Sequence, residues 1–390
     1  QLEKCFFLRN FVLYFQYYQY YIIMRKHFFT VILLMSAVVS SYAQFQLSNN
    51  GFEEWEDVSY SNKTGNEPVG WSSFLDGTGS MKSLAAANQL EKSTDVRPGT
   101  TGKYSAKLFS RKVIFSIVAQ GNLTNGCVNM GSISATDASG NYNYINHERQ
   151  DQSMRFAGRP DAVKIWTKFN GTKTGNVEVS LITDGYYQSP RSDKNPATAT
   201  LVAHAKNSEI ASNDTWTEYV IPFDYPESVA SDVRPEFVLV NISTCAEPGG
   251  GSGTDYLIAD DIEMVYNSEL SAAKYAGRSL TVTDGVATVD AIYDVALLEL
   301  ESNGRGASVA KTYDIKTGIV KVVVTGDNIA EDASNKHEYT IKFNIDHGTL
   351  GIDSVNASEE DGKMYDVSGR QVTKTVNGLY IKNGKAFIAK

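Results

Sequence analysis

Aromatic side chains with polar neighbours are the residues of this sequence whose chemistry points to a ligand. Tyr186 and Tyr187 stand in a loop rich in Gly, Ser and Pro, and Arg191 and Asp193 follow closely. Trp166 lies between two lysines on the polar side of an alternating segment. An aromatic ring can cover the apolar face of a pyranose while charged and amide groups bond its hydroxyls. These five residues are candidate saccharide contacts. For Trp166, a ring covered by a loop or by lysine stems is an equal alternative.

Other aromatic residues divide between a second candidate run and the expected core. Residues 141–144 read NYNY, which is a further polar-aromatic run. Trp55, Trp71 and Trp216 stand at strand positions or turn junctions. We expect these three tryptophans to pack against the core rather than to contact a ligand.

Signals for catalysis are weak. A glycosidase needs two carboxylates about 5 to 10 Å apart across a cleft, one of them with a raised pKa. The clustered acids, at 53–56 and 260–261, fall in two segments that are better explained as paired strands. The histidines after residue 43, at 147, 204, 337 and 347, are isolated in the sequence. No Ser-His-Asp arrangement or phosphate-binding glycine loop is evident.

Period-two alternation of apolar side chains predicts β-strands along the chain after residue 43. Residues 162–169 place Val163, Ile165 and Phe169 on one face, and residues 177–181, 217–223 and 238–242 alternate likewise. No stretch in this part shows a sustained helical period. Each strand then has one apolar face to bury, which antiparallel sheets packed as a sandwich achieve. The sequence therefore predicts an all-β protein.

Turn signals divide the predicted strands into three parts. Residues 44–267 form the first, in which the glycine-rich segment 247–255 is a hairpin because a strong strand follows it. Residues 270–344 hold five short strands and suit a small immunoglobulin-like sandwich. Residues 351–390 hold three short strands, too few to bury a core alone.

Charge excludes two classes of partner. The chain of 390 residues has a formal net charge of −9 and is 42% hydrophobic. Its first 43 residues carry a surplus of three positive charges, which leaves the remainder near −12. An acidic surface of this kind argues against nucleic acid and against anionic membranes.

The N-terminal region predicts export. Arg25 and Lys26 precede an apolar stretch that ends in a small-residue cleavage site at Ala43, so residues 24–43 are typical of a secretory signal. The apolar stretch is shorter than the roughly 18 to 20 residues that span a bilayer. Residues 1–23 precede the first plausible start methionine and are interpreted as translated upstream sequence. We expect a protein that is secreted or at the outer cell surface, without a transmembrane span in its mature chain.

Two cysteines remain in the mature chain, Cys127 and Cys245. In an exported protein they could form one disulfide, and two unpaired, half-buried thiols are the alternative. Neither belongs to a CxxC motif or has a nearby histidine, so a zinc site is not expected.

Seven segments of residues 44–267 carry a family resemblance: GFEEW at Gly51, EPVGWSSF at Glu67, RPGTTGKYSAKLFS at Arg97, QGNLTNGCVNMGS at Gln120, RPDAVKIWTKF at Arg159, NISTCAEPG at Asn241 and IADDIEMVY at Ile258. In this order they resemble the PCMD family of secreted Bacteroidetes proteins, which is named for carbohydrate metabolism. The resemblance implies a lectin-like or carbohydrate-binding jelly roll and no particular activity.

The later parts carry weaker resemblances. Residues 270–344 resemble the Ig-like modules that often accompany that family. The tail MYDVSGRQVTKTVNGLYIKNGKAFIAK resembles a short form of the C-terminal sorting domain of type IX secretion. That resemblance implies the outer-membrane secretion machinery as a partner.

The jelly-roll resemblance also implies a structural Ca²⁺ where the opening strand meets the closing strand. The matching positions are Glu53 and Asp260 or Asp261. Alternation predicts Asp260 on the same face as Ile258, Ile262 and Met264, where a buried charge needs a partner and oxygen ligands on two strands suit Ca²⁺. The alternative is that Asp260 accepts backbone hydrogen bonds or pairs with Lys103 or Arg97.

These observations favour a non-catalytic, secreted or surface-displayed protein that binds an oligo- or polysaccharide. One alternative is a glycoside hydrolase or polysaccharide lyase built on a lectin-like jelly roll. Another is a structural, fimbria-like component of the cell surface, for which the edge strands of the Ig-like part would matter. A concave site with an aromatic ring and amides but no facing pair of acids would favour binding.

Overall fold

A computed structural model gives the fold of the chain and describes residues 44–85, 88–113, 117–290, 294–314, 316–344, 363–366, 370–374, 378–382 and 385–389. The predicted upstream segment 1–23, the predicted signal 24–43 and the start of the C-terminal part lie outside the described residues. Among the described residues, no helix is long and apolar enough to cross a membrane.

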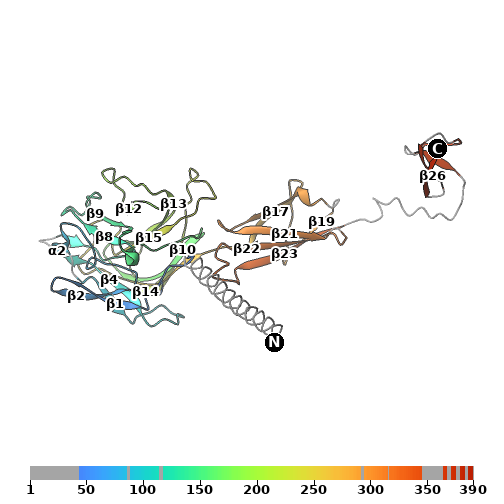
Figure 1. Ribbon diagram of the computed structural model, residues 1–390. Helices are drawn as coiled ribbons and strands as arrows, with labels where there is room; N and C mark the ends of the chain where they lie inside the picture. Colours follow the sequence, from blue (N-terminus) through green and yellow to red (C-terminus); the bar gives the residue numbers. More distant parts are fainter. Residues whose placement is uncertain are drawn as a thin grey trace, which may run out of the picture. The chain divides into compact units, whose positions relative to one another are not determined.

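Two antiparallel sheets form the first unit (Figure 1). The five-stranded sheet has the order β14 (Asn213–Pro222), β10 (Ala162–Asn170), β16 (Tyr256–Val265), β4 (Ser105–Phe109) and β3 (Leu90–Ser93). The four-stranded sheet has the order β13 (Leu201–Ile210), β11 (Gly175–Ile182), β15 (Phe237–Ser243) and β7 (Asn122–Thr124). The predicted all-β class is confirmed, and so is the predicted β-sandwich in the first part of the chain.

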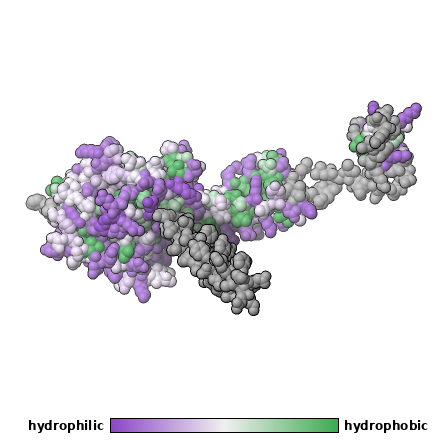
Figure 2. Space-filling view, viewed as in Figure 1, coloured by the Kyte–Doolittle hydropathy of each residue, from purple (hydrophilic) through white to green (hydrophobic). Residues whose placement is uncertain are grey.

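Shorter elements surround this sandwich. They are the hairpin β1 (Trp55–Tyr60) and β2 (Lys63–Pro68), the pair β5 (Arg111–Lys112) and β6 (Val118–Ala119), the helix α2 (Lys82–Ala85), the 3-10 turn η1 (Gln150–Gln152) and a three-stranded sheet of β12 (Gln188–Ser189), β9 (Asn141–Tyr144) and β8 (Cys127–Met130). The face of this unit seen in Figure 2 is mainly hydrophilic, with small separate hydrophobic patches.

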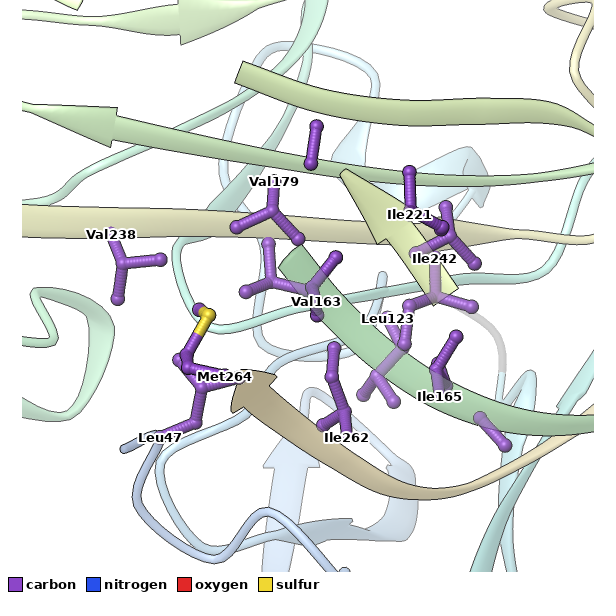
Figure 3. Close-up of a cluster of buried hydrophobic side chains, with 14 of the residues drawn as sticks. Leu47, Leu123, Val163, Ile165, Val179, Ile221, Val238, Ile242, Ile262 and Met264 are labelled. Carbon is purple, nitrogen blue, oxygen red and sulfur yellow. The ribbon is translucent and has the colours of Figure 1, made fainter. Parts of the chain in front are cut away.

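The core of the first unit lies between the two large sheets. Val163 and Ile165 of β10 and Val179 of β11 are fully buried, and Figure 3 shows side chains of both sheets pointing toward one another. Each such side chain stabilises the fold by about 1.5 to 3 kcal/mol relative to an exposed one. Trp71 belongs to this core and meets Phe52 edge to face, with ring centroids 5.1 Å apart. Trp55 packs against the core from a partly buried position.

A β-bulge corrects the predicted alternation of β16. Lys164 of β10 pairs with Glu263, but Trp166 pairs with Asp260, so an extra residue of β16 is accommodated between these pairs. Asp261 takes a φ of 42°, a left-handed conformation that interrupts the alternation. Leu257 and Ala259 face the core before the bulge, whereas Ile262 and Met264 do so after it. Asp260 is therefore buried on the outer face, and its predicted place beside Ile262 and Met264 is wrong.

The second unit is also built of strands. One sheet has the order β18 (Arg278–Ser279), β17 (Leu270–Tyr275) and β20 (Leu298–Ser302), and the 3-10 turn η2 (Val295–Leu297) precedes β20. The other has the order β19 (Val286–Val289), β23 (Lys336–Phe343), β22 (Ile319–Thr325) and β21 (Ser308–Asp314), in which β19 and β23 run parallel. Val320, Val322 and Ile341 are fully buried in this unit. Strands β25 (Gln371–Val372), β24 (Met364–Asp366), β26 (Gly378–Lys382) and β27 (Lys385–Ala389) pair in a C-terminal sheet.

The division into compact units does not follow the chain strictly. The first unit holds the described residues up to Ser271 together with Ser302–Val309 and Val324–His337. Asp327 of the last segment binds the Arg234 guanidinium, with Oδ1 2.6 Å from Nη2, and accepts the backbone N–H of Arg159 at 2.7 Å. The predicted limits of 44–267, 270–344 and 351–390 stay predictions.

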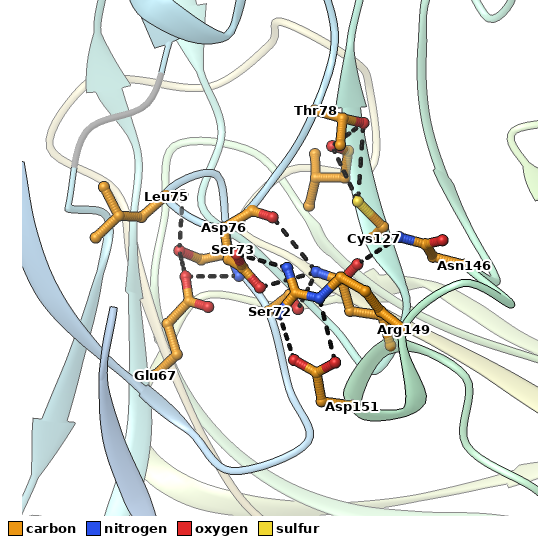
Figure 4. A network of polar contacts seen from close by, with 12 residues as sticks. Glu67, Ser72, Ser73, Leu75, Asp76, Thr78, Cys127, Asn146, Arg149 and Asp151 are labelled. Carbon is orange, nitrogen blue, oxygen red and sulfur yellow. Dashed lines mark hydrogen bonds and ion pairs between the residues drawn. The ribbon is translucent and has the colours of Figure 1, made fainter. Parts of the chain in front are cut away.

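A network of polar contacts holds the segment that follows β2 (Figure 4). Glu67, at the end of β2, is 2% exposed and accepts hydrogen bonds from the backbone N–H of Ser73, at 2.9 Å, and from its hydroxyl. Asp76 pairs with Arg149 at 2.8 Å and accepts a hydrogen bond of 2.8 Å from Gln152. Burial raises the pKa of the Glu67 carboxyl to about 7.

We predict that Glu67 makes stability depend on pH. Because the folded pKa is about 7 and the unfolded value is 4.5, the folded state binds more protons between these values, and this group's contribution falls as pH rises. The difference amounts to about 3 kcal/mol at about 1.4 kcal/mol per pKa unit. Glu67→Gln keeps the acceptor oxygen, so it should gain stability relative to wild type across this window. Urea unfolding at several pH values measures the effect.

The control is Glu91→Gln, because Glu91 is an exposed carboxylate on β3 of the same unit. Its stability should run parallel to the wild-type curve. Parallel curves for Glu67→Gln as well would show that the Glu67 carboxyl does not titrate in this range in the folded protein.

Candidate functional site

A cavity of about 450 Å³ lies between the outer face of the four-stranded sheet, here called the floor, and the three-stranded sheet β12–β9–β8, here called the roof. Floor side chains that line it come from four strands: Asn122 of β7, Asn176 and Glu178 of β11, His204 and Lys206 of β13, and Asn241 and Ser243 of β15. Roof residues that line it include Val128, Met130, Tyr142, Asn143 and Ser189.

Strand alternation explains why the floor is polar. Along β11, Val177, Val179 and Leu181 enter the core, so Asn176 and Glu178 must point to the opposite face. The same holds for β15, where the core residues Val240 and Ile242 flank Asn241. Glu178 and Asn241 are directly opposite each other in the register of β11 and β15.

Asparagine side chains connect roof and floor. Asn143 of the roof donates to Asn241 Oδ1 at 2.8 Å and accepts from Asn122 Nδ2 at 2.8 Å. Thr124 of β7 donates to the same Oδ1 of Asn241 at 3.1 Å. These bonds fix the amide planes, because the oxygen of Asn241 is held by two donors.

Two amide nitrogens of the floor are left for a ligand. Asn241 is 6% exposed and Asn176 is 8% exposed, and both line the cavity. The oxygen of Asn176 accepts from Ser208 at 3.0 Å, but the Nδ2 atom of neither asparagine donates a hydrogen bond to any residue the structure describes. Both residues line the cavity, so each nitrogen can donate a hydrogen bond to a water molecule or to a ligand oxygen there.

Glu178 is an acceptor held among donors. Its Oε1 lies 2.9 Å from His204 Nε2 and 3.0 Å from the Ser189 hydroxyl, and its Oε2 lies 3.7 Å from Lys206 Nζ. Burial by itself raises the pKa of this carboxyl, but the His204 hydrogen bond and the Lys206 charge outweigh it and lower the pKa below its ordinary value. Glu178 is therefore ionised at neutral pH and is unsuited to act as a general acid.

Carboxylates are scarce in the cavity. Glu178 is the only aspartate or glutamate among the described residues that line it. A glycosidase of the usual kind needs a second carboxylate facing the first across the bound sugar. The lining described here does not supply that pair.

The predicted loop residues divide between the cavity and the surface. Tyr187 lines the cavity but is 2% exposed, with its hydroxyl 3.2 Å from that of Ser180, and packs with Ile182 and Phe237 in a second apolar cluster. Arg191 also lines the cavity, 5.8 Å above the Tyr187 ring. The Tyr186 hydroxyl donates to Gln188 at 2.6 Å, and Asp193 is exposed; neither lines the cavity.

Trp166 lies on the other sheet. It stands on β10 opposite Asp260, and the Arg97 guanidinium covers its ring at 5.5 Å. The covering loop that was the alternative for Trp166 is thus present. Lys164 and Lys168 of the same strand pair with Glu263 at 2.7 Å and Asp95 at 2.8 Å. The five candidate saccharide contacts therefore do not form one site.

The three candidate calcium ligands have protein partners. Glu53 accepts the backbone N–H groups of Lys103 and Tyr104 at 2.9 to 3.1 Å. Asp260 accepts those of Arg97 and Asp261, each at 2.9 Å, and Asp261 pairs with the Arg97 side chain. Burial raises the pKa of Asp260 to about 6. Among the described residues, no group of three or more His, Cys, Asp or Glu residues could hold a metal.

The two cysteines do not form a disulfide. Cys127 on β8 and Cys245 after β15 are both buried free thiols. Cys127 faces Thr78, whose hydroxyl lies 3.8 Å from its sulfur, and burial raises the pKa of both thiols. The alternative of two unpaired cysteines holds.

Sequence reasoning missed the residues of the floor. Asn122, Asn176, Glu178 and Asn241 were not singled out as candidates, and His204 was taken as an isolated histidine. One feature of the sequence could have indicated them: polar residues alternate with core residues on both β11 and β15, which are neighbouring strands. Residues 141–144, noted as a polar-aromatic run, do line the cavity through Asn141, Tyr142 and Asn143.

Comparison with family models and with curated proteins gave no match. Among solved structures, the chain is similar to a candidate glycoside hydrolase from Bacteroides thetaiotaomicron, with 15% identity, a TM-score of 0.41, and coverage of 56% of this chain and 71% of that one. A candidate glycoside hydrolase from Bacteroides vulgatus gives 15% identity, a TM-score of 0.38, and coverage of 57% and 98%. A carbohydrate-binding module specific for non-crystalline cellulose gives 10% identity, a TM-score of 0.23, and coverage of 54% and 97%.

Proposed function

We propose that the first unit is a carbohydrate-binding module that holds an oligo- or polysaccharide in the cavity without cleaving it. The observation that carries the proposal is a pair of amide nitrogens in the cavity lining, of Asn176 and Asn241, that lack a described acceptor beside the ionised Glu178. A sugar hydroxyl both donates and accepts, so it can bond an amide N–H and a carboxylate oxygen together.

The proposed affinity is modest. Most hydroxyls exchange water for protein partners with a net gain of only about 0.5 to 1.5 kcal/mol each. One site of this kind gives dissociation constants on the order of micromolar to millimolar. Avidity through several copies or repeated ligand units would then set the strength of attachment to a polymer.

Substitutions on the two sheets should separate the cavity from the Trp166 surface. A glycan array on the chain from Gln44 onward identifies a ligand, which is then titrated calorimetrically. Asn176→Ala removes one free donor and should weaken binding by about 2- to 10-fold. Trp166→Ala is the matched control on the opposite sheet and should change the affinity less than twofold.

Two results would contradict the proposal. Loss of binding in Trp166→Ala with normal binding in Asn176→Ala would move the site to the other sheet. Release of reducing sugar by wild type, lost in Glu178→Gln, would show that the cavity is catalytic.

A polysaccharide lyase is the second candidate, and the basic groups near Glu178 favour it. Lys206 and Arg191 could offset a uronate carboxylate, while His204 took the proton from the neighbouring carbon. The carbon–oxygen bond at the next position would break, and the departing oxygen would take up a proton. This activity predicts an unsaturated uronate product with strong ultraviolet absorbance from uronate polymers. No increase in absorbance with wild type would exclude it.

A structural Ca²⁺ at Glu53, Asp260 and Asp261 stays a prediction, since N–H donors already occupy these oxygens. If the ion is bound, a chelator should lower the melting temperature and added Ca²⁺ should restore it. Asp261→Asn, which weakens the candidate site, should make the melting temperature insensitive to both additions. An unchanged melting temperature, with no calcium in elemental analysis, would leave the hydrogen bonds as the full explanation.

Secretion or surface display, and sorting through the outer-membrane machinery, also stay predictions. The residues on which they rest, 24–43 and part of 351–390, lie outside the described residues.

A further inference from the structure

The cavity has two chemically different ends, which the order of the floor strands defines. His204 and Lys206 lie on β13 at one edge of the floor, next to Glu178 on β11. Ile117 and Val118 line the cavity from the segment that leads through β6 into β7, the strand at the opposite edge of the floor. We call these the charged end and the apolar end.

The roof repeats this division. Ser189 of β12 bonds Glu178, which places the following Arg191 at the charged end. Strand β8, at the other edge of the roof sheet, supplies Met130. The backbone N–H of Met81 donates to the Met130 carbonyl at 2.8 Å, so the Met81 side chain, which also lines the cavity, belongs to the apolar end.

An exposed apolar rim continues the apolar end. Ile133 follows β8, lines the cavity and is 58% exposed. Ala135 and Gly249 are close neighbours, since a Cβ atom added to Gly249 would lie 2.6 Å from that of Ala135. Gly249 in turn donates to the Gln120 side chain at 3.3 Å, which brings the rim next to the β6 side of the floor.

A sugar without an apolar substituent does not explain the apolar end of the cavity. Pyranose faces are usually matched by flat aromatic rings, whereas the apolar residues named above are Ile, Val and Met, with Phe74 as a further apolar residue of the lining. Aliphatic and thioether side chains suit alkyl or acyl groups, and Met adapts its shape to them. The volume of about 450 Å³ falls within the range of about 300 to 1,000 Å³ that is typical of sites for drug-sized molecules.

We propose that the cavity takes an amphiphilic glycoside, with its sugar near Glu178 and Asn176 and an alkyl or acyl group against Met81, Val118 and Met130. This inference rests on the carbohydrate-binding function proposed above and names the class of its ligand. The charged end orients the sugar through hydroxyl bonds, and the apolar end gains free energy by removing the alkyl chain from water.

Matched glycosides test the proposal. Octyl and methyl glycosides of glucose, galactose, mannose and N-acetylglucosamine are titrated into the chain from Gln44 onward, with the octyl compounds below their micelle concentrations. For at least one sugar, the octyl compound should bind at least about tenfold more tightly than the methyl compound, which corresponds to a few buried methylene groups. 1-Octanol serves as the alkyl probe without sugar.

Variants locate the effect. Val118→Asp and Ile133→Ser should reduce the octyl advantage, and Ile133→Ser carries little risk to folding because its side chain is largely exposed. Trp166→Ala on the other sheet should leave the advantage unchanged. Melting temperatures of all variants show whether each is folded.

The outcomes separate this inference from the function on which it rests. Equal affinities within every octyl and methyl pair, with glycan binding to the array, would overturn the amphiphilic ligand and keep carbohydrate binding. Octanol that binds as tightly as every octyl glycoside, with a blank array, would overturn both the glycoside and the carbohydrate function. If both cavity variants still bind octyl glycosides more tightly than methyl glycosides, the placement of the alkyl group at the apolar end is wrong. If no probe binds, the inference as a whole is wrong.

Discussion

The alternation of side chains along β11 and β15 is the constraint on which the first unit depends. These strands are the two central members of the four-stranded sheet, so each has a neighbour on both sides and cannot shift its register without disturbing the whole sheet. One face supplies the fully buried Val179 and Val240 to the core. The other face must then present Glu178 and Asn241, whose polar groups require the asparagine network and the roof above them. The pairing of β11 with β15 therefore determines both the core on one face of the sheet and the cavity on the other.

A second local device shapes the opposite sheet. The bulge at Asp261 turns Asp260 out of the core and under Arg97, where backbone N–H groups satisfy its carboxylate. Arg97 also pairs with Asp261 and covers Trp166. Arg97 thus covers the part of the outer face of the five-stranded sheet around Trp166 and Asp260.

The electrostatics of the cavity favour binding over acid catalysis. A buried carboxylate without a basic partner has a raised pKa, as Glu67 has, but His204 and Lys206 lower the pKa of Glu178. The contrast shows that the environment of each glutamate, and not its burial alone, decides its protonation state. Glu178 in its ionised form accepts hydrogen bonds in a fixed direction, which suits recognition of hydroxyl groups.

The sequence by itself determined the all-β class, because a period of two in the apolar residues has one physical solution: strands that bury one face. It also indicated that Trp71 belongs to the core, and it marked residues 141–144 as a polar-aromatic run that could contact a ligand. Only the tertiary structure decided which polar faces meet water and which meet the roof, since Asn176 and Glu178 alternate with valines just as exposed residues do. It also separated Trp166 from Tyr187, and it moved Asp260 to the outer face, because a bulge changes the direction of every later side chain without leaving a mark in the composition. Side-chain period is a local property that the sequence carries, whereas the partner of each face is set by the packing of segments far apart in the chain, as Asn143 and Asn241 are.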